Sequence, residues 1–570
     1  MKVAGTELPP ILADAVRACR PHLAAAVAFS LFINLLFLAP AIYMLQVYDR
    51  VVATAGKTTL FYITIALVIA LLALSALDAI RNRLLVRASL RLDTLVAPVI
   101  LKRMMGLHSG NAVQAMRDFD NVRQAVGSPV VAALFDAPWA PLYLLVAFLL
   151  HFWIGMLALL SSVLLLFVAW RNQRATQEAT QVASQAMAAS HQEAQAVALH
   201  SDTVRALGMT GRMVDRQLGH RKLGLRRSAD AAFAGGRYSA LSRFLRLFVQ
   251  SAALGVGALL AIDGHISAGA IIAASILLGR ALQPIEAVVG GWSTLGSARA
   301  ALQRLATVLG DAPAERIHTR LPAPKGHVQV DQVGLRGPDG RPMLVGVSLE
   351  VRPGEMLGVI GPSGSGKTTL AKIIAGAIIP ELGTVRIDGA QLADWDPDAL
   401  AQHTGFLPQE PSLFEGTIKE NISRFAATRS SEIDDQVVAA ALAAGVHELI
   451  LRLPQGYDTR LGPLGAGLSA GQAQRVALAR ALFGDPAVLI LDEPNAFLDA
   501  DGETALLAAV ESAIARGASV IMVAHRRTVL RGAHRLLVLD AGRPKLLGPA
   551  AEVAARLSAP AASENRESAA

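Results

Sequence analysis

Residues 361–369 read GPSGSGKTT and directly follow the apolar run MLGVI of residues 356–360. An apolar strand that enters a glycine-rich loop and then a helix forms a cradle for phosphate, because backbone N–H groups and the helix N-terminus face the anion. Such a loop places Lys367 at the terminal phosphates and the Thr368 hydroxyl on Mg²⁺. The predicted phosphate-binding residues are Gly361, Pro362, Ser363, Gly364, Ser365, Gly366, Lys367, Thr368 and Thr369.

A second phrase, LSAGQ at residues 468–472, follows further along the chain. This order of motifs resembles the ATP-binding cassette (ABC) family, in which such a signature segment closes over ATP held by the other subunit. Ala470 stands where the commonest form of the signature has glycine. The resemblance implies that Ser469, Gly471 and Gln472 contact nucleotide, and that the chain works as a homodimer.

Two adjacent carboxylates, Asp492 and Glu493, end the apolar run of residues 488–491. A buried strand that ends in this way places Asp492 beside Mg²⁺ and Glu493 where a water molecule attacks the γ-phosphate. Glu493 is therefore the predicted general base. Adjacent carboxylates alone often mark only a solvated strand end, so the prediction depends on the neighbouring motifs.

The resemblance assigns three further residues. Gln409 matches the Q-loop, whose amide contacts the metal and the attacking water; Asp499 matches the D-loop at the dimer interface. His525 matches the switch histidine that contacts the γ-phosphate. Together these elements predict an active ATPase that uses ATP and Mg²⁺, with Thr368, Gln409 and Asp492 on the metal.

Two positions depart from the family pattern. The family stacks an aromatic ring on adenine from the first strand of the cassette, but Gly337 occupies the corresponding position here. Adenine recognition must then depend on another group, for which Arg336 is a candidate. Pro463 stands where many exporters carry a glutamate, and we have no physical account of that replacement.

The first half of the chain is unusually apolar. Hydrophobic residues make up 53% of the sequence and charged residues 17%, with a mean hydropathy of +0.43. Residues 21–48 and 58–77 contain no Asp, Glu, Lys or Arg, and each run exceeds or matches the ~20 residues that cross a bilayer. The first run is too long for a signal peptide, so we interpret it as a retained span.

Four more spans complete a predicted set of six. The uncharged run of residues 137–170 accommodates two spans only if the first starts near Pro129, which puts Asp136 inside it and a tight outer turn at residues 151–155. The fifth and sixth spans are predicted at residues 247–262 and from residue 265 to about 284.

Arginines concentrate after span two and between spans four and five. The positive-inside rule then places both termini, both long connectors and the ATPase in the cytoplasm of a bacterial inner-membrane protein. The formal charge of +8 is explained by this topology and by anionic membrane lipid, so no nucleic-acid partner is expected. Residues 172–244 lack proline and predict a long helical hairpin whose tip reaches a nucleotide-binding domain.

The chain is thus predicted to be an α-helical six-span transmembrane domain of the ABC exporter type, fused to an α/β P-loop nucleotide-binding domain. The predicted domains are a cytoplasmic N-terminal segment (1–20), the transmembrane domain (21–307), a linker (308–325), the ATPase (326–555) and a disordered tail (556–570). The single cysteine, Cys19, is expected on the cytoplasmic side.

Three membrane phrases, at residues 39–51, 134–143 and 279–285, resemble the type I secretion exporters. The closest likeness is to the short protease-exporter branch without an N-terminal peptidase-like domain. This resemblance implies an unfolded protein substrate, often a calcium-binding RTX protein, with an uncleaved C-terminal signal. It also implies a periplasmic adaptor (membrane fusion protein) and a TolC-like outer-membrane channel as partners.

Asp136 and Arg280 are ionisable groups at membrane depth, which is costly for an unpaired charge. They either pair structurally or line a polar translocation path, and the sequence favours neither. An exporter of lipids or amphipathic small molecules shares the same architecture and is the alternative function. A regulator with an inactive cassette would be expected to lack Glu493 or His525, and both are present.

Overall fold

The computed structural model describes residues 2–3, 6–104, 109–310, 321–337, 339–426, 430–524, 530 and 532–558. Two compact units make up the chain, Met1–Ala314 and Glu315–Ala570. The first is helical apart from a short N-terminal hairpin of β1 (Lys2–Val3) and β2 (Thr6–Glu7), and the second is an α/β unit.

The first unit is built from long helices. They are α1 (Pro10–Leu36), α2 (Ala39–Gln46), a π-helical turn (Val47–Val52), α3 (Lys57–Met104), α4 (Ser109–Val126), α5 (Pro129–Asp136), α6 (Ala140–Leu150), α7 (Phe152–Leu199), α8 (Ser201–Ala206), α9 (Thr210–Ile262), α10 (Ala268–Gly290) and α11 (Trp292–Gly310). Six stretches of the described residues are long and apolar enough to cross a membrane. The predicted set of six spans is therefore confirmed by length and composition.

The turn between spans three and four is shorter than predicted. α6 ends at Leu150 and α7 begins at Phe152, so His151 alone, with extended φ and ψ, reverses the chain. Gly155 is helical, and a Cβ there would lie 2.3 Å from the Phe148 ring. This glycine therefore permits close packing of the two spans, and the sequence analysis was wrong to include it in the turn.

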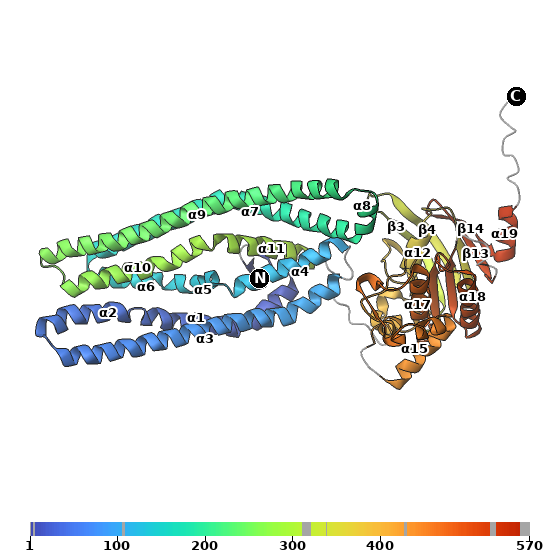
Figure 1. Ribbon diagram of the computed structural model, residues 1–570, viewed down its shortest axis with the longest axis horizontal. Helices are drawn as coiled ribbons and strands as arrows, with labels where there is room; N and C mark the ends of the chain where they lie inside the picture. Colours follow the sequence, from blue (N-terminus) through green and yellow to red (C-terminus); the bar gives the residue numbers. More distant parts are fainter. Residues whose placement is uncertain are drawn as a thin grey trace, which may run out of the picture. The chain divides into compact units, whose positions relative to one another are not determined.

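The predicted helical hairpin between spans four and five is confirmed. α7 and α9 lie side by side along most of their length, and α8 stands at the turn (Figure 1). Gly208, with φ of 63°, follows α8 and takes a left-handed conformation that side chains disfavour. That the hairpin tip touches a nucleotide-binding domain stays a prediction.

The predicted N-terminal segment is not separate from the helical unit. α1 begins at Pro10, and Leu12 and Cys19 are buried in a cluster with Val96, Phe119 and Leu305. At the other end of the unit, α11 continues to Gly310 because Leu309 is buried in the same cluster. The helix therefore enters the predicted linker, of which residues 311–320 lie outside the described residues.

The second unit contains a six-stranded sheet, a four-stranded sheet and a two-stranded sheet, with helices around them. Its strands are β3 (Val328–Arg336), β4 (Pro342–Val351), β5 (Met356–Ile360), β6 (Leu382–Ile387), β7 (Ala390–Gln391), β8 (Thr404–Leu407), β9 (Gly416–Thr417), β10 (Arg460–Leu461), β11 (Val488–Asp492), β12 (Ser519–Val523), β13 (Arg535–Asp540) and β14 (Arg543–Pro549). Its helices are α12 (Lys367–Ile374), α13 (Pro397–Ala401), α14 (Ile418–Ile422), α15 (Ser431–Ala443), α16 (His447–Leu451), α17 (Ala470–Leu482), α18 (Ala500–Ala515) and α19 (Ala550–Ser558).

The larger sheet has the strand order β14-β13-β5-β12-β11-β8, and only β14 is antiparallel to its neighbour. β11 and β12 are buried along their whole length, as expected for central parallel strands. Because parallel strands end at one edge, the segments after β5, β8, β11 and β12 meet there. The first three of these segments carry the phosphate loop, Gln409 and Glu493 in turn.

The predicted tail begins too early in the chain. α19 extends to Ser558, and Leu557 packs against the core of the second unit. Residues 559–570 lie outside the described residues.

Candidate nucleotide-binding site

The phosphate loop lies between β5 and α12, as predicted from its sequence. Gly366 precedes the first residue of α12 and has a φ of 94°. A Cβ on Gly366 would lie 2.7 Å from Leu344 Cδ2 and 2.8 Å from the Met343 carbonyl oxygen. Glycine is therefore required here by both backbone conformation and space.

Lys367 lies inside the loop. Its Nζ donates hydrogen bonds to the carbonyl oxygens of Gly361, at 2.9 Å, and Pro362, at 2.8 Å. Burial lowers the pKa of Lys367, and the neighbouring Asp492 and Glu493 oppose this shift. The loop thus places a cationic amine where the sequence predicts phosphate.

Asp492 is the most deeply buried acidic residue of the predicted set, with a relative exposure of 0%. Its Oδ1 accepts a hydrogen bond of 3.3 Å from the Thr368 hydroxyl, and burial raises its pKa. Its Oδ2 is buried and has no hydrogen-bond partner within the described ranges. A carboxylate with a free oxygen beside a hydroxyl fits the oxygen ligands that Mg²⁺ prefers, so these residues could hold the metal.

Glu493 directly follows β11 in a left-handed conformation, with φ of 49°. Its backbone N–H donates to the Val523 carbonyl at 2.9 Å, which holds the residue between two central strands. Gln409 Nε2 donates to Glu493 Oε2 at 3.2 Å. A non-glycine residue in this region costs roughly 1–3 kcal/mol and is typical of functional sites.

A cavity of about 420 Å³ collects these groups. Its lining includes Ser363, Gly364, Ser365, Gly366, Lys367, Thr368, Thr369, Gln409 and Glu493. The structure therefore brings together most of the predicted phosphate-binding and catalytic residues of one chain. His525 lies outside the described residues.

Four lining residues were missed by the sequence analysis: Pro342, Met343, Ala541 and Gly542. The Gly542 N–H donates to the Ser365 carbonyl at 3.2 Å, and a Cβ on Gly542 would lie 2.6 Å from the Met343 carbonyl oxygen. A glycine in a turn between two strands is ordinary, so nothing in the sequence marks this one.

Met343 lines the cavity close to Gly337, the position at which the family has an aromatic residue. A Cβ on Gly337 would lie 3.4 Å from Met343 Sδ, and Met343 itself is 41% exposed. Met343 thus provides an apolar surface beside the position where the family has its ring. Pro463 begins a short 3₁₀ turn, residues Pro463–Gly465, and its role remains unexplained.

The signature residues are held by local contacts. Ser469 caps α17: its hydroxyl accepts from the Gln472 N–H at 3.3 Å, and Gln472 Oε1 accepts from the Ser469 N–H at 2.9 Å. A Cβ on Gly471 would lie 2.9 Å from the Phe497 carbonyl oxygen. The signature helix therefore packs closely against the D-loop.

Asp499 caps α18 and pairs with Arg475 of α17. The hydrogen bond from the Gly502 N–H, and secondly that from Arg475, lower the pKa of the Asp499 carboxyl group. Within the described part of the chain, neither the signature residues nor Asp499 line the cavity at the phosphate loop. One chain thus presents two separate surfaces, which the homodimer prediction requires.

Sequence comparison identifies the family. Residues 344–496 match the ABC transporter family. The chain is 41% identical over 557 residues to the type I secretion system ATP-binding protein PrsD of Rhizobium meliloti, across 96% of this chain and 95% of that protein. The chain belongs to the ABC transporters of type I secretion. The predicted ATPase activity is confirmed by this membership.

Other relatives are longer than this chain. The cyclolysin secretion/processing ATP-binding protein CyaB of Bordetella pertussis is 31% identical across 90% of this chain and 73% of its own length. The exotoxin translocation ATP-binding protein PaxB of Pasteurella aerogenes shows the same identity and coverage. The exporter therefore resembles toxin translocators through both its helical and its ATPase unit.

A solved structure confirms the predicted fold class. The structure of a bacterial Atm1-family ABC exporter with ATP bound aligns with a TM-score of 0.81 over 95% of this chain and 99% of that one, at 22% identity. The exporter is thus a multi-pass membrane protein with a six-span domain and a P-loop ATPase domain.

In the helical unit, Asp136 and Arg280 line one cavity of about 470 Å³ but do not pair with each other. Asp136 Oδ1 accepts from Arg81 at 2.6 Å and from Asn34 Nδ2 at 2.9 Å. The Arg280 guanidinium lies 4.0 Å from the centre of the Phe37 ring and donates to Gln283 at 2.9 Å. Sequence reasoning used Arg81 only to orient the spans and missed it as the partner of Asp136.

Substitution of Gly366 tests the geometry of the loop. Gly366→Ala should abolish measurable binding of MgATP, because the new Cβ meets the Met343 backbone and the residue must keep a positive φ. Fluorescence titration with a nucleotide analogue measures this loss. Gly376→Ala is the matched control, because this glycine also has a positive φ, of 77°, but no atom within 4 Å of an added Cβ. Nucleotide binding by Gly366→Ala equal to that of the control would contradict the assignment.

Proposed function

We propose that the chain is the inner-membrane ATPase and permease of a type I secretion system that exports an unfolded protein with an uncleaved C-terminal signal. The observation that carries this proposal is the 41% identity to PrsD over nearly the whole of both chains. Identity of this extent covers the membrane-spanning unit, which meets the substrate, as well as the shared ATPase. The alternative function, export of lipids or amphipathic small molecules, is an outcome of the test below.

ATP hydrolysis in this proposal is carried out by the residues at the edge of the large sheet. Lys367 and the backbone of the phosphate loop bind the phosphates, while Thr368, Asp492 and Gln409 hold Mg²⁺. Bound Mg²⁺ neutralises phosphate charge and orients the γ-phosphate. Glu493 accepts the proton of the attacking water, and Gln409 positions the carboxylate through its hydrogen bond of 3.2 Å.

The complete ATPase is proposed to be a homodimer. The separation of the signature surface from the phosphate loop within one chain supports this arrangement, because Ser469, Gly471 and Gln472 then cover the nucleotide of the partner. Asp499 stands at the end of the D-loop, next to the signature helix, where it reaches the same interface. His525 is proposed to contact the γ-phosphate from the segment after β12.

The proposed assembly crosses the whole envelope of the cell. Arginine-rich connectors place the ATPase and both termini in the cytoplasm. A periplasmic adaptor and a TolC-like outer-membrane channel then continue the path outward. We propose these partners because the chain is related to PrsD, a type I secretion system protein, and to PaxB, an exotoxin translocation protein.

Arg280 is proposed to line the translocation path, together with Asp136. Its guanidinium faces the cavity and has no carboxylate partner in the described part of the chain. Arg280→Gln should therefore reduce secretion at least about fivefold while the exporter stays in the membrane, because a polar cavity loses its unpaired charge. Quantitative blotting of the medium measures the effect. Secretion at the parental level would remove Arg280 from the path.

The proposed function is tested by comparing extracellular proteins. Cells that lack the gene should lose one or a few proteins from the medium, and the wild-type chain should restore them. Purified exporter should then show ATPase stimulation by the C-terminal peptide of the lost protein. An unchanged medium, together with stimulation by amphipathic small molecules instead of the peptide, would establish the alternative function.

A further inference from the structure

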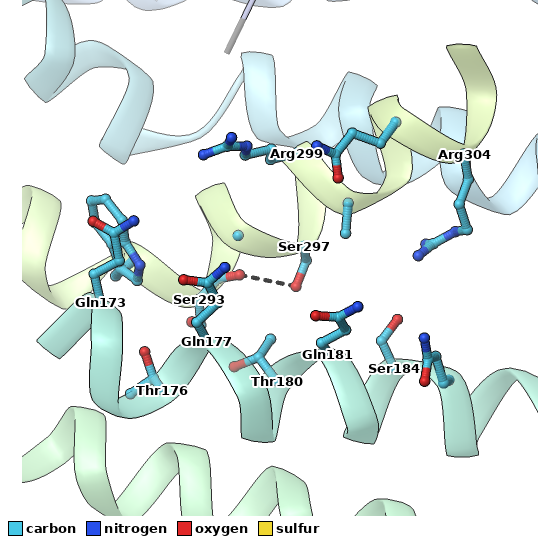
Figure 2. Close-up of a pocket in the computed structure, with 15 residues that line it drawn as sticks. Gln173, Thr176, Gln177, Thr180, Gln181, Ser184, Ser293, Ser297, Arg299 and Arg304 are labelled. Carbon is cyan, nitrogen blue, oxygen red and sulfur yellow. Dashed lines mark hydrogen bonds between the residues drawn. The ribbon is translucent and has the colours of Figure 1, made fainter. Parts of the chain in front are cut away.

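A polar groove lies between α7 and α11, within the helical unit. It encloses about 340 Å³. Gln173, Gln177, Gln181 and Gln185 of α7 follow one another at intervals of four residues, beside the hydroxyls of Thr176, Thr180 and Ser184. Figure 2 shows Gln173, Gln177 and Gln181 pointing toward α11, from which Ser293 and Ser297 face them. The groove begins just after the uncharged run that ends at Trp170.

The four glutamines have unused hydrogen-bonding capacity. Within the described ranges, none of their side chains has a hydrogen bond to another protein group. By contrast, the Thr176 hydroxyl donates to the Asn172 carbonyl at 2.8 Å, and the Ser297 hydroxyl donates to the Ser293 carbonyl at 2.9 Å. Each glutamine amide offers both a donor and an acceptor. Four such amides in one row therefore match a ligand that repeats donors and acceptors.

The spacing of the row matches an extended polypeptide. Four residues of α-helix rise about 6 Å, and two residues of extended chain rise about 6.6–6.8 Å. The spacing between successive glutamines is therefore close to the distance between every second peptide group of an extended chain. The row from Gln173 to Gln185 spans about 18 Å, the length of five to six extended residues.

The charge of the groove favours the same occupant. Arg299 lines it and has no ion pair with a described residue, while Arg304 is paired with Asp118 at 2.6 Å. No acidic side chain lines the groove in the described part of the chain. Amides and hydroxyls can bind the peptide groups of any sequence, so the groove would select an extended backbone. Its positive charge would disfavour a segment rich in basic side chains.

We propose that this groove binds the backbone of the exported polypeptide in extended form, through the glutamine row of α7. The inference rests on the proposed function and names the surface at which the unfolded substrate is held. It gives the exporter a means to hold successive segments of one substrate without reading their side chains.

Crosslinking from within the groove tests the proposal. Gln181 is replaced by the photoreactive p-benzoylphenylalanine in the full-length exporter in lipid nanodiscs. The probe is a fluorescent, disordered 20-residue peptide of Gly, Ser and Thr, and the matched control position is Gln195, which is exposed on α7 outside the groove. The expected result is a peptide adduct from position 181 and none from position 195. Equal adducts from both positions, or adducts only to a second copy of the exporter, would overturn the proposal.

Backbone recognition is tested with a second peptide and a second variant. The same peptide, N-methylated at alternate residues, has lost half of its N–H donors and should bind about tenfold more weakly. Replacement of all four glutamines by leucine should weaken binding of the unmethylated peptide by a similar factor, and the single variant Gln195→Leu should not. Elution volume and thermal unfolding check that each variant is folded. Equal binding of both peptides to the wild-type exporter would overturn backbone recognition, even if the four-residue variant fails to fold.

The two proposals fail in different ways. If gene deletion removes proteins from the medium but position 181 gives no peptide adduct, the groove assignment is wrong and protein export stands. If the medium is unchanged and only small molecules stimulate the ATPase, both proposals are wrong.

Discussion

Glu493→Gln should lower the kcat of ATP hydrolysis by about 10²–10⁴-fold, the usual contribution of a general base. The amide keeps the shape of the side chain and its contact with Gln409, at 3.2 Å in the parent, but cannot accept the proton from water. ATP binding should survive, because the phosphate loop that lines the same cavity is unchanged. Release of inorganic phosphate from the purified exporter measures the loss.

The same variant should trap two copies around ATP. Crosslinking between the signature segment of one copy and the phosphate loop of the other, in the full-length exporter, reports this closure directly. Glu410→Gln is the matched control, because this neighbouring carboxylate is exposed and lies outside the cavity lining. Turnover by Glu493→Gln near that of Glu410→Gln would remove Glu493 from the role of base.

The second large effect is expected in the helical unit, at Arg81. This side chain is only 7% exposed and pairs with Asp136, itself 18% exposed. It also pairs with Asp78 at 2.6 Å and donates to the Ser30 hydroxyl at 3.0 Å. Arg81→Ala should therefore lower the free energy of unfolding by about 3–5 kcal/mol, because it leaves Asp136 as a buried, uncompensated charge.

This loss in the free energy of unfolding is measured by denaturant unfolding in detergent, with protease resistance as the readout of the folded fraction. Arg83→Ala is the control on the same helix, because Arg83 is exposed. The double variant Arg81→Met with Asp136→Leu should regain much of the stability, since both charges are then removed. Equal stability of Arg81→Ala and Arg83→Ala would show that the ion pair does not hold α1, α3 and α5 together.

Much of the ATP site was predictable, because each of its motifs is a short continuous stretch of sequence. The phosphate loop, Asp492 and Glu493 each follow a short apolar strand, and parallel pairing brings the strand ends to one edge. Long-range pairs were not predictable. Arg81 and Asp136 are far apart in the sequence. From the sequence alone, Asp136 could equally pair with Arg280, and Arg81 with another carboxylate. Hydropathy located the membrane spans because it reports burial in lipid and needs no partner.

Capping and close packing also escaped sequence reasoning. Ser469 was assigned to the nucleotide, and its hydroxyl is also the N-cap of α17. Gly155 was assigned to a turn, although its role is to admit the Phe148 ring. In each case the residue type allows two uses, and only the three-dimensional neighbours distinguish them.

Reconstituted transport tests the central claim most directly. The protein that is lost from the medium of deletion cells is added, unfolded, to inside-out proteoliposomes containing the exporter and MgATP. The account predicts that this protein becomes protected from external protease with the wild-type exporter and stays fully digestible with Glu493→Gln. Protection that is equal in the two preparations, or that occurs without ATP, would contradict the claim that ATP hydrolysis in this chain drives polypeptide export.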